Sequence, residues 1–108
     1  MSDLAETLDR LAATIAARKG ADPAASYTAK LLSDGPGRCA KKFGEEAVEA
    51  VIAAVSGDKE ATASESADVL YHLLVLLAAT GVDLDDVAAK LKAREGRSGI
   101  EEKASRGR

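Results

Sequence analysis

Acidic side chains recur at helical spacing in two segments of this chain. The first segment contains Glu45, Glu46 and Glu49, and the second contains Glu65 and Asp68. Residues three or four positions apart lie on the same face of a helix, so the members of each group can point the same way. An acidic side chain that borders the largely apolar residues 69–79 is costly to bury unless it is paired or binds a metal. Two such groups that face each other would form a site for a hard divalent cation.

Each acidic group alone would more often be a solvated helix face. The combination is more specific, because the two groups lie at comparable distances from a turn near Gly57. Folding the two helices into an antiparallel hairpin would bring the groups level, and repulsion would then raise the pKa values of the carboxylates. A cation between them removes this conflict. Mg²⁺ usually takes one or two carboxylates and leaves its other positions to water and substrate phosphates, and four or five carboxylates can hold more than one ion.

Basic and aromatic residues near these acids have two interpretations. Lys41 and Lys42 lie one turn before the first group, where lysines are usually exposed partners of acids, but near a metal they could neutralise a phosphate. Lys30 is ambiguous in the same way. His72 lies one turn after Asp68, and a histidine on an apolar helix is more often a satisfied core or interface group than a general base or ligand.

Composition excludes several classes of protein. The chain has 108 residues and a net charge of −3, which fits a single domain and lacks the basic surface of a general nucleic-acid binder. The longest unbroken apolar run, residues 73–79, is much shorter than a membrane span, and the first residues do not resemble a signal peptide. Cys39 is the only cysteine, so no intrachain disulfide can form. We therefore expect a cytoplasmic protein with no membrane partner, in which Cys39 is a buried structural thiol and not a nucleophile.

The abundance of alanine and leucine, with few strand-favouring residues, predicts an all-α fold. Helices are expected over residues 3–19, 27–32, 38–55, 59–80 and 84–94. The segment 33–37 is dense in glycine, proline and other turn residues, and predicts a loop.

Several residues are expected to begin these helices or to form the core. Asp3 with Glu6 predicts a capping pair for the first helix. Three further N-caps are expected at Ser26, Asp58 and Asp83. The core face of the fourth helix is expected to be Val69, Leu70, Leu73, Leu74 and Leu77.

The helix expected over residues 38–55 is apolar on nearly all sides. Phe43, Ala47 and Val51 lie on one stripe, while Val48 and Ile52 lie on another. A helix of this kind is buried on several sides, which is difficult to achieve in a small monomer. We therefore expect a homodimer in which two helical hairpins form a four-helix-bundle-like core.

The residues around the acids make the pattern more specific. The sequence reads SYTAKL at 26–31, KKFGEE at 41–46, ADVLYHLL at 67–74 and SGIEEKASR at 98–106. Together with Glu-Glu-x-x-Glu followed by Glu-x-x-Asp, these segments resemble the phosphoribosyl-ATP pyrophosphatase family of histidine biosynthesis. That family lies within the MazG-like superfamily of all-α nucleoside triphosphate pyrophosphatases. The similarity covers nearly the whole chain.

This resemblance implies a nucleotide-binding hydrolase that converts phosphoribosyl-ATP and water into phosphoribosyl-AMP and pyrophosphate. It also implies that Mg²⁺, or Mn²⁺, is held by Glu46, Glu49, Glu65 and Asp68. Glu45 would complete the catalytic set as a further ligand or as the base that orients water. The candidate phosphate contacts are Lys30, Lys42, Arg94, Lys103 and Arg106.

Two other functions are compatible with parts of the pattern. A housekeeping nucleoside triphosphate pyrophosphatase would keep the acids but would not need the segments at 26–31 and 98–106. A non-catalytic helical dimerisation module would leave the acids exposed and would show no stabilisation by metal.

Residues 97–108 contain few apolar side chains and are expected to form a flexible tail, which the family resemblance places over the phosphates of the substrate.

Overall fold

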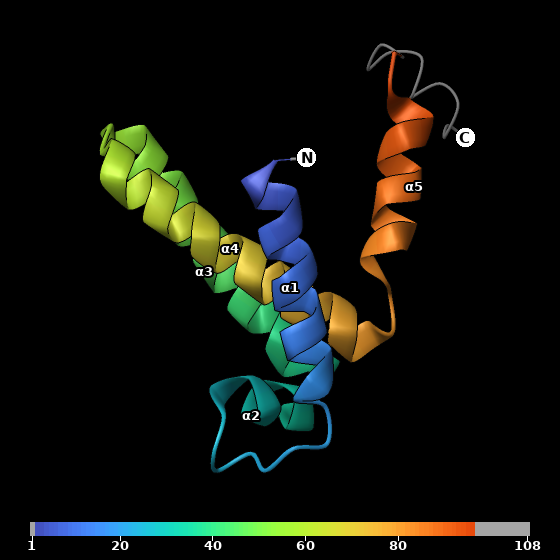
Figure 1. Cartoon of the computed structure of the whole chain (residues 1–108). Coiled ribbons are helices and arrows are strands. Elements are labelled where there is room, and N and C mark those ends of the chain that lie inside the picture. Colours follow the sequence, from blue (N-terminus) through green and yellow to red (C-terminus); the bar gives the residue numbers. More distant parts are fainter. Residues whose placement is uncertain (1, 97–108) are drawn as a thin grey trace, which may run out of the picture.

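The computed structural model describes residues 2–96, and all secondary structure in that range is helical. The predicted all-α fold is therefore confirmed. Figure 1 shows the arrangement of the helices. The helices are α1 (Asp3–Ala17), α2 (Tyr27–Asp34), α3 (Pro36–Ser56), α4 (Lys59–Thr80) and α5 (Leu84–Arg94).

The two longest helices, α3 and α4, lie side by side as an antiparallel hairpin (Figure 1). Gly57 ends α3 with φ of 81°, a conformation that glycine adopts without steric cost. Asp58 then caps α4, because its side chain accepts a hydrogen bond from the backbone N–H of Ala61 at 2.9 Å. This tight turn fixes the register of the hairpin, and with it the relative positions of the acidic residues.

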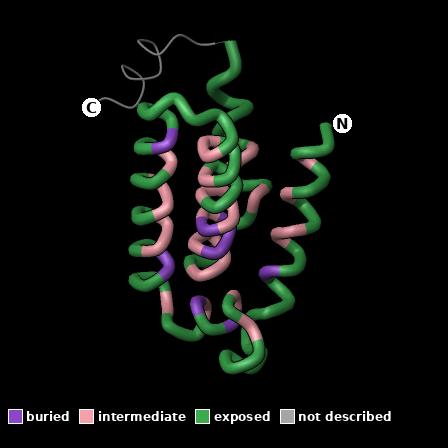
Figure 2. The backbone as a smooth tube through the Cα atoms, turned by 90° about the vertical axis from the view of Figure 1, so that its left-hand side faces the viewer, coloured by how far each residue is buried: buried purple, intermediate pink, exposed green. Residues whose placement is uncertain are grey.

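The buried core lies where α1, α2, α3 and the second half of α4 meet (Figure 2). It consists of Ile15, Leu31, Cys39, Leu74 and Val75. The thiol of Cys39 is fully buried and donates a hydrogen bond to the carbonyl oxygen of Leu31 at 3.3 Å. Burial, with a smaller contribution from Asp34, raises the pKa of this thiol. Cys39 is therefore a structural residue, as predicted.

The first helix differs from its prediction at both ends. Its N-cap is Ser2, whose hydroxyl accepts a hydrogen bond from the backbone N–H of Ala5 at 3.1 Å. The predicted capping pair of Asp3 and Glu6 is wrong, because both residues lie inside the first turn. There they interact favourably with the positive end of the helix dipole. The helix also ends at Ala17, two residues earlier than predicted.

The loop predicted at residues 33–37 is wrong. Only Gly35 separates α2 from α3, with φ of 97°. Pro36 is the first residue of α3, a position where its missing N–H costs no helical hydrogen bond. Turn-forming residues therefore produce a sharp corner between two helices here. The predicted caps Ser26 and Asp58 are confirmed, and Asp83 forms a capping box with Asp86.

The apolar face predicted for α4 is only partly correct. Leu74 is buried, and Leu77 packs against the core, but Val69, Leu70 and Leu73 are only half-buried. Val75, which was not predicted, is fully buried. The core is displaced toward the end of α4 because α1 and α2 cover only that end of the hairpin (Figure 1).

The last helix, α5, diverges from the rest of the chain. Its axis makes an angle of 111° with that of α4 (Figure 1). Among the described residues, no single helix is long and apolar enough to cross a membrane, although the bent pair of α4 and α5 passes that test on length and composition alone.

Candidate metal centre

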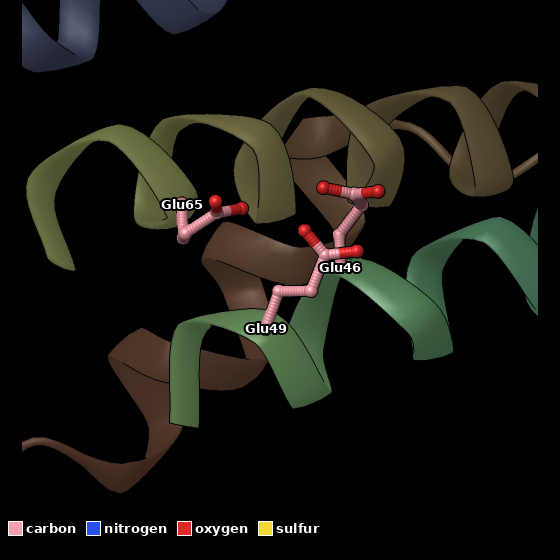
Figure 3. A group of neighbouring side chains, drawn as sticks. All are labelled: Glu46, Glu49 and Glu65. Atoms are coloured by element: carbon pink, nitrogen blue, oxygen red, sulfur yellow. The ribbon is translucent and has the colours of Figure 1, made fainter. Parts of the chain in front are cut away.

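Three carboxylates from two helices meet in the middle of the α3–α4 hairpin. Glu46 and Glu49 lie one turn apart on α3, and Glu65 approaches them from α4 (Figure 3). Each offers one carboxylate oxygen, and these oxygens lie within 4.8 Å of one another. We call these three residues the glutamate cluster. The hairpin register therefore brings acids from both sequence segments together.

Glu65 is the most electrostatically strained member of the cluster. Its Oε1 atom is buried and has no hydrogen-bond partner among the described residues. Burial raises the pKa of Glu65, and the charges of Glu49, Asp68 and Glu46 raise it further. A buried oxygen without a partner is costly, and a cation would both satisfy it and offset the repulsion. The donor set consists only of carboxylate oxygens, which suits a hard ion such as Mg²⁺ or Mn²⁺.

Asp68 and Glu45 lie beside the cluster and are not members of it. Asp68 is close enough for its charge to raise the pKa of Glu65, but it does not share the 4.8 Å group. Glu45 forms an ion pair with Lys42, whose Nζ lies 3.2 Å from its Oε1. This hydrogen bond is the largest cause of the raised pKa of Lys42, and Tyr27 is the next. Lys42 therefore brings a positive charge to the border of the acidic site.

Lys30 and Arg94, two other predicted phosphate contacts, lie outside the glutamate cluster. Lys30 forms an ion pair with Asp34 at 3.1 Å, within α2. Arg94 lies in the last turn of α5, which diverges from the hairpin (Figure 1). Lys103, Arg106 and the predicted tail at 97–108 lie outside the described residues.

Aromatic side chains form the other border of the site. His72 is only 6% exposed, and its ring is nearly perpendicular to those of Tyr71 and Tyr27, with centroid distances of 4.9 and 6.1 Å. The hydroxyl groups of Tyr71 and Thr28 share a hydrogen bond that ties α2 to α4.

The prediction that His72 is a satisfied core group is only partly correct. Its ring is buried, but its Nδ1 has no hydrogen-bond partner among the described residues. Burial lowers the pKa of His72, opposed mainly by the charge of Glu46. No role for Tyr27 was predicted. The Ser26 cap could have located it, because the residue after a cap is the first of a helix, here α2.

An all-helical hairpin that gathers carboxylates from both of its helices is the arrangement expected of the all-α nucleoside triphosphate pyrophosphatases. Comparison with known sequences is more specific. Residues 8–95 match the family described as phosphoribosyl-ATP pyrophosphohydrolase. The chain belongs to this family, and the resemblance inferred from the sequence motifs is confirmed.

Individual relatives agree with this assignment. A protein from Cereibacter sphaeroides is 69% identical over 100 residues, which is 93% of this chain and 97% of the relative. One from Paracoccus denitrificans is 70% identical over 99 residues, 92% of each chain. One from Caulobacter vibrioides is 68% identical over 103 residues, 95% of each chain. All three are named phosphoribosyl-ATP pyrophosphatase.

Proposed function

We propose that this protein hydrolyses phosphoribosyl-ATP to phosphoribosyl-AMP and pyrophosphate, a step of histidine biosynthesis. The observation that carries the proposal is the glutamate cluster, formed within a chain of this family. Relatives that align with more than nine-tenths of the chain are named phosphoribosyl-ATP pyrophosphatase. The bond that breaks is the anhydride between the α- and β-phosphates, and water supplies the new oxygen on the α-phosphate.

The glutamate cluster would hold Mg²⁺ or Mn²⁺, and Asp68, whose charge acts on Glu65, would be a fourth ligand. When bound, such a cation polarises a phosphate oxygen and lowers the pKa of bound water. The chain's own residues would then position the substrate. Lys42 would neutralise charge on a phosphate, and Glu45, which it pairs with at 3.2 Å, would serve as a further ligand or would orient water. Support for metal binding comes from the unpartnered buried oxygen of Glu65.

We also infer that the protein acts as a homodimer. Val48, Val51, Ile52 and Val55 of α3 are all exposed in the single chain, Val55 to 82%. Helix α5 contacts the core through Leu84 but leaves Leu91 exposed. A second hairpin against α3 would bury the valine and isoleucine side chains and would form a four-helix core. A cytoplasmic location, expected from the lone cysteine, remains a prediction.

An assay of pyrophosphate release tests the proposed reaction. The purified protein is incubated with phosphoribosyl-ATP and Mg²⁺, and with ATP and deoxynucleoside triphosphates as controls. We expect kcat/KM to be at least about a hundredfold higher for phosphoribosyl-ATP. A preference for an ordinary nucleoside triphosphate would instead indicate the housekeeping pyrophosphatase that shares the same carboxylates.

A further inference from the structure

Tyr27 is an exposed aromatic ring on a rigid support. It is the first residue of α2 and is 54% exposed. Its ring lies perpendicular to that of His72, which is itself buried and packed perpendicular to Tyr71. The hydrogen bond between Thr28 and Tyr71 holds the same turn of α2 against α4. The ring is therefore fixed by its neighbours while much of its surface remains open to a ligand.

The position of this ring relative to the acidic site is informative. Tyr27 begins α2, which packs against the start of α3, where the thiol of Cys39 donates a hydrogen bond to the carbonyl oxygen of Leu31. The centroid of the Tyr27 ring lies 6.1 Å from that of His72, which follows Asp68 by one turn of α4. Tyr27 also contributes to the raised pKa of Lys42. Beyond Lys42 along α3 come Glu45, which contacts the ammonium group at 3.2 Å, and then the glutamate cluster. The aromatic ring thus belongs to the end of the hairpin where α3 begins, and the positive charge and then the glutamate cluster follow along α3.

A nucleotide carries complementary groups in the same order, with its base at one end and its phosphates and their cation at the other. We propose that Tyr27 is a stacking platform for the purine ring of the substrate, whose phosphates extend past Lys42 toward the glutamate cluster. This inference rests on the proposed function and deepens it, because it assigns the residue that would recognise the purine base of the substrate. Stacking requires the π-face of the ring and not its hydroxyl.

Two variants at this position separate the ring from its polar group. Tyr27→Leu keeps an apolar side chain but removes the aromatic face. We expect it to raise KM for phosphoribosyl-ATP about tenfold, while kcat changes by less than about twofold. Tyr27→Phe should recover most of the lost affinity. Leu4→Ala removes another exposed apolar side chain, on α1, and serves as the control that should leave both constants unchanged.

Direct binding distinguishes this inference from the proposed reaction. Calorimetry in the presence of Mg²⁺ should show that Tyr27→Leu raises the Kd of AMP about tenfold and leaves the Kd of inorganic pyrophosphate unchanged. An unchanged Kd of AMP, or an equal rise in the Kd of both ligands, would overturn the stacking role. Dissociation of a dimer by Tyr27→Leu would also overturn it, since the ring would then be an interface residue. Selective loss of AMP affinity in a protein that fails to cleave phosphoribosyl-ATP would support the subsite and reject the reaction.

Discussion

Glu65 is the residue where the fold conflicts most with electrostatics. Its carboxylate is brought against Glu49, and one of its oxygens is buried without a partner. Both burial and like charge penalise the ionised form. A protein tolerates such an arrangement when the site serves a ligand, because the strain is relieved on binding.

The raised pKa of Glu65 has a defined consequence for stability without metal. Because its pKa in the folded protein is above the ordinary value of 4.5, Glu65 costs no stability well below pH 4.5. Stability is then lost as the pH rises through the folded pKa. We therefore expect Glu65→Gln to be more stable than wild type at pH 8 in a metal chelator, with a smaller difference at pH 4. Urea unfolding at both pH values measures this, and a variant that is less stable at pH 8 would contradict it.

The carboxylates should matter for activity through their charge. Glu49→Gln and Asp68→Asn nearly preserve shape, so packing is unaffected while the charge of a proposed ligand is lost. We expect each to lower kcat/KM by about a hundredfold or more at saturating Mg²⁺, because the cation serves the transition state. Glu60→Gln, in the first turn of α4, is the matched control and should be nearly neutral. Near-normal turnover in both site variants would refute the proposed metal site.

Sequence spacing predicted part of this site. Residues three apart on one helix must share a face, so the proximity of Glu46 and Glu49 follows from the sequence, and the short Gly57–Asp58 turn brings Glu65 to them. Pairing of Lys41 and Lys42 with the acids that follow them was one of two interpretations of the sequence, and the structure shows it for Lys42 with Glu45, three residues apart. Tyr27 was missed since its environment depends on how α2 packs against α4.

At the scale of the elements, local signals explain which helix boundaries were predicted correctly. Both ends of α4 and of α5 match the prediction, because Asp58 and Asp83 cap their starts and Gly81 ends α4 with φ of 75°. The junction of α2 and α3 was missed, since glycine and proline are compatible with a loop and also with a corner between helices. Only the packing of Leu31 and Cys39 into one core selects the corner.

Two glycines, one inside α3 and one at its C-terminal cap, should respond oppositely to the same substitution. Gly57 has φ of 81°, so Gly57→Ala should lower the free energy of unfolding by about 1 kcal/mol. Gly44 is inside the helix, and an added Cβ would meet nothing within 4 Å. Gly44→Ala should therefore raise the free energy of unfolding by roughly 0.5–1 kcal/mol. Chemical denaturation of both variants is the measurement, and a destabilised Gly44→Ala or a Gly57→Ala of unchanged stability would contradict the prediction.

At the scale of the whole molecule, the single chain leaves one side of the hairpin uncovered. The core gathers at the end where α1 and α2 pack, while the outer face of α3 stays exposed (Figure 2). Sequence patterning predicted that this helix needs cover on several sides, which a homodimer would provide. What patterning could not predict is the path of α5, because its direction depends on the bend after Gly81.

The dimer has a direct test. Sedimentation at micromolar concentration should show a species of twice the 11.1 kDa chain mass. Ile52→Asp places a charge on the exposed apolar face of α3, and should shift the protein to monomers because burying that charge in an interface is costly. Leu4→Asp introduces the same charge on α1 and should leave the dimer intact. A wild-type protein that sediments only at 11.1 kDa would refute the homodimer.

We propose that the carboxylates of the α3–α4 hairpin hold a divalent cation for hydrolysis of phosphoribosyl-ATP. Pyrophosphate release from this substrate, measured while Mg²⁺ is titrated into metal-free protein, tests this. We predict a rate that is negligible in chelator, rises saturably with Mg²⁺, and is not restored in Glu49→Gln at any Mg²⁺ concentration. A full rate in chelator, or equal Mg²⁺ dependence in wild type and Glu49→Gln, would contradict the claim.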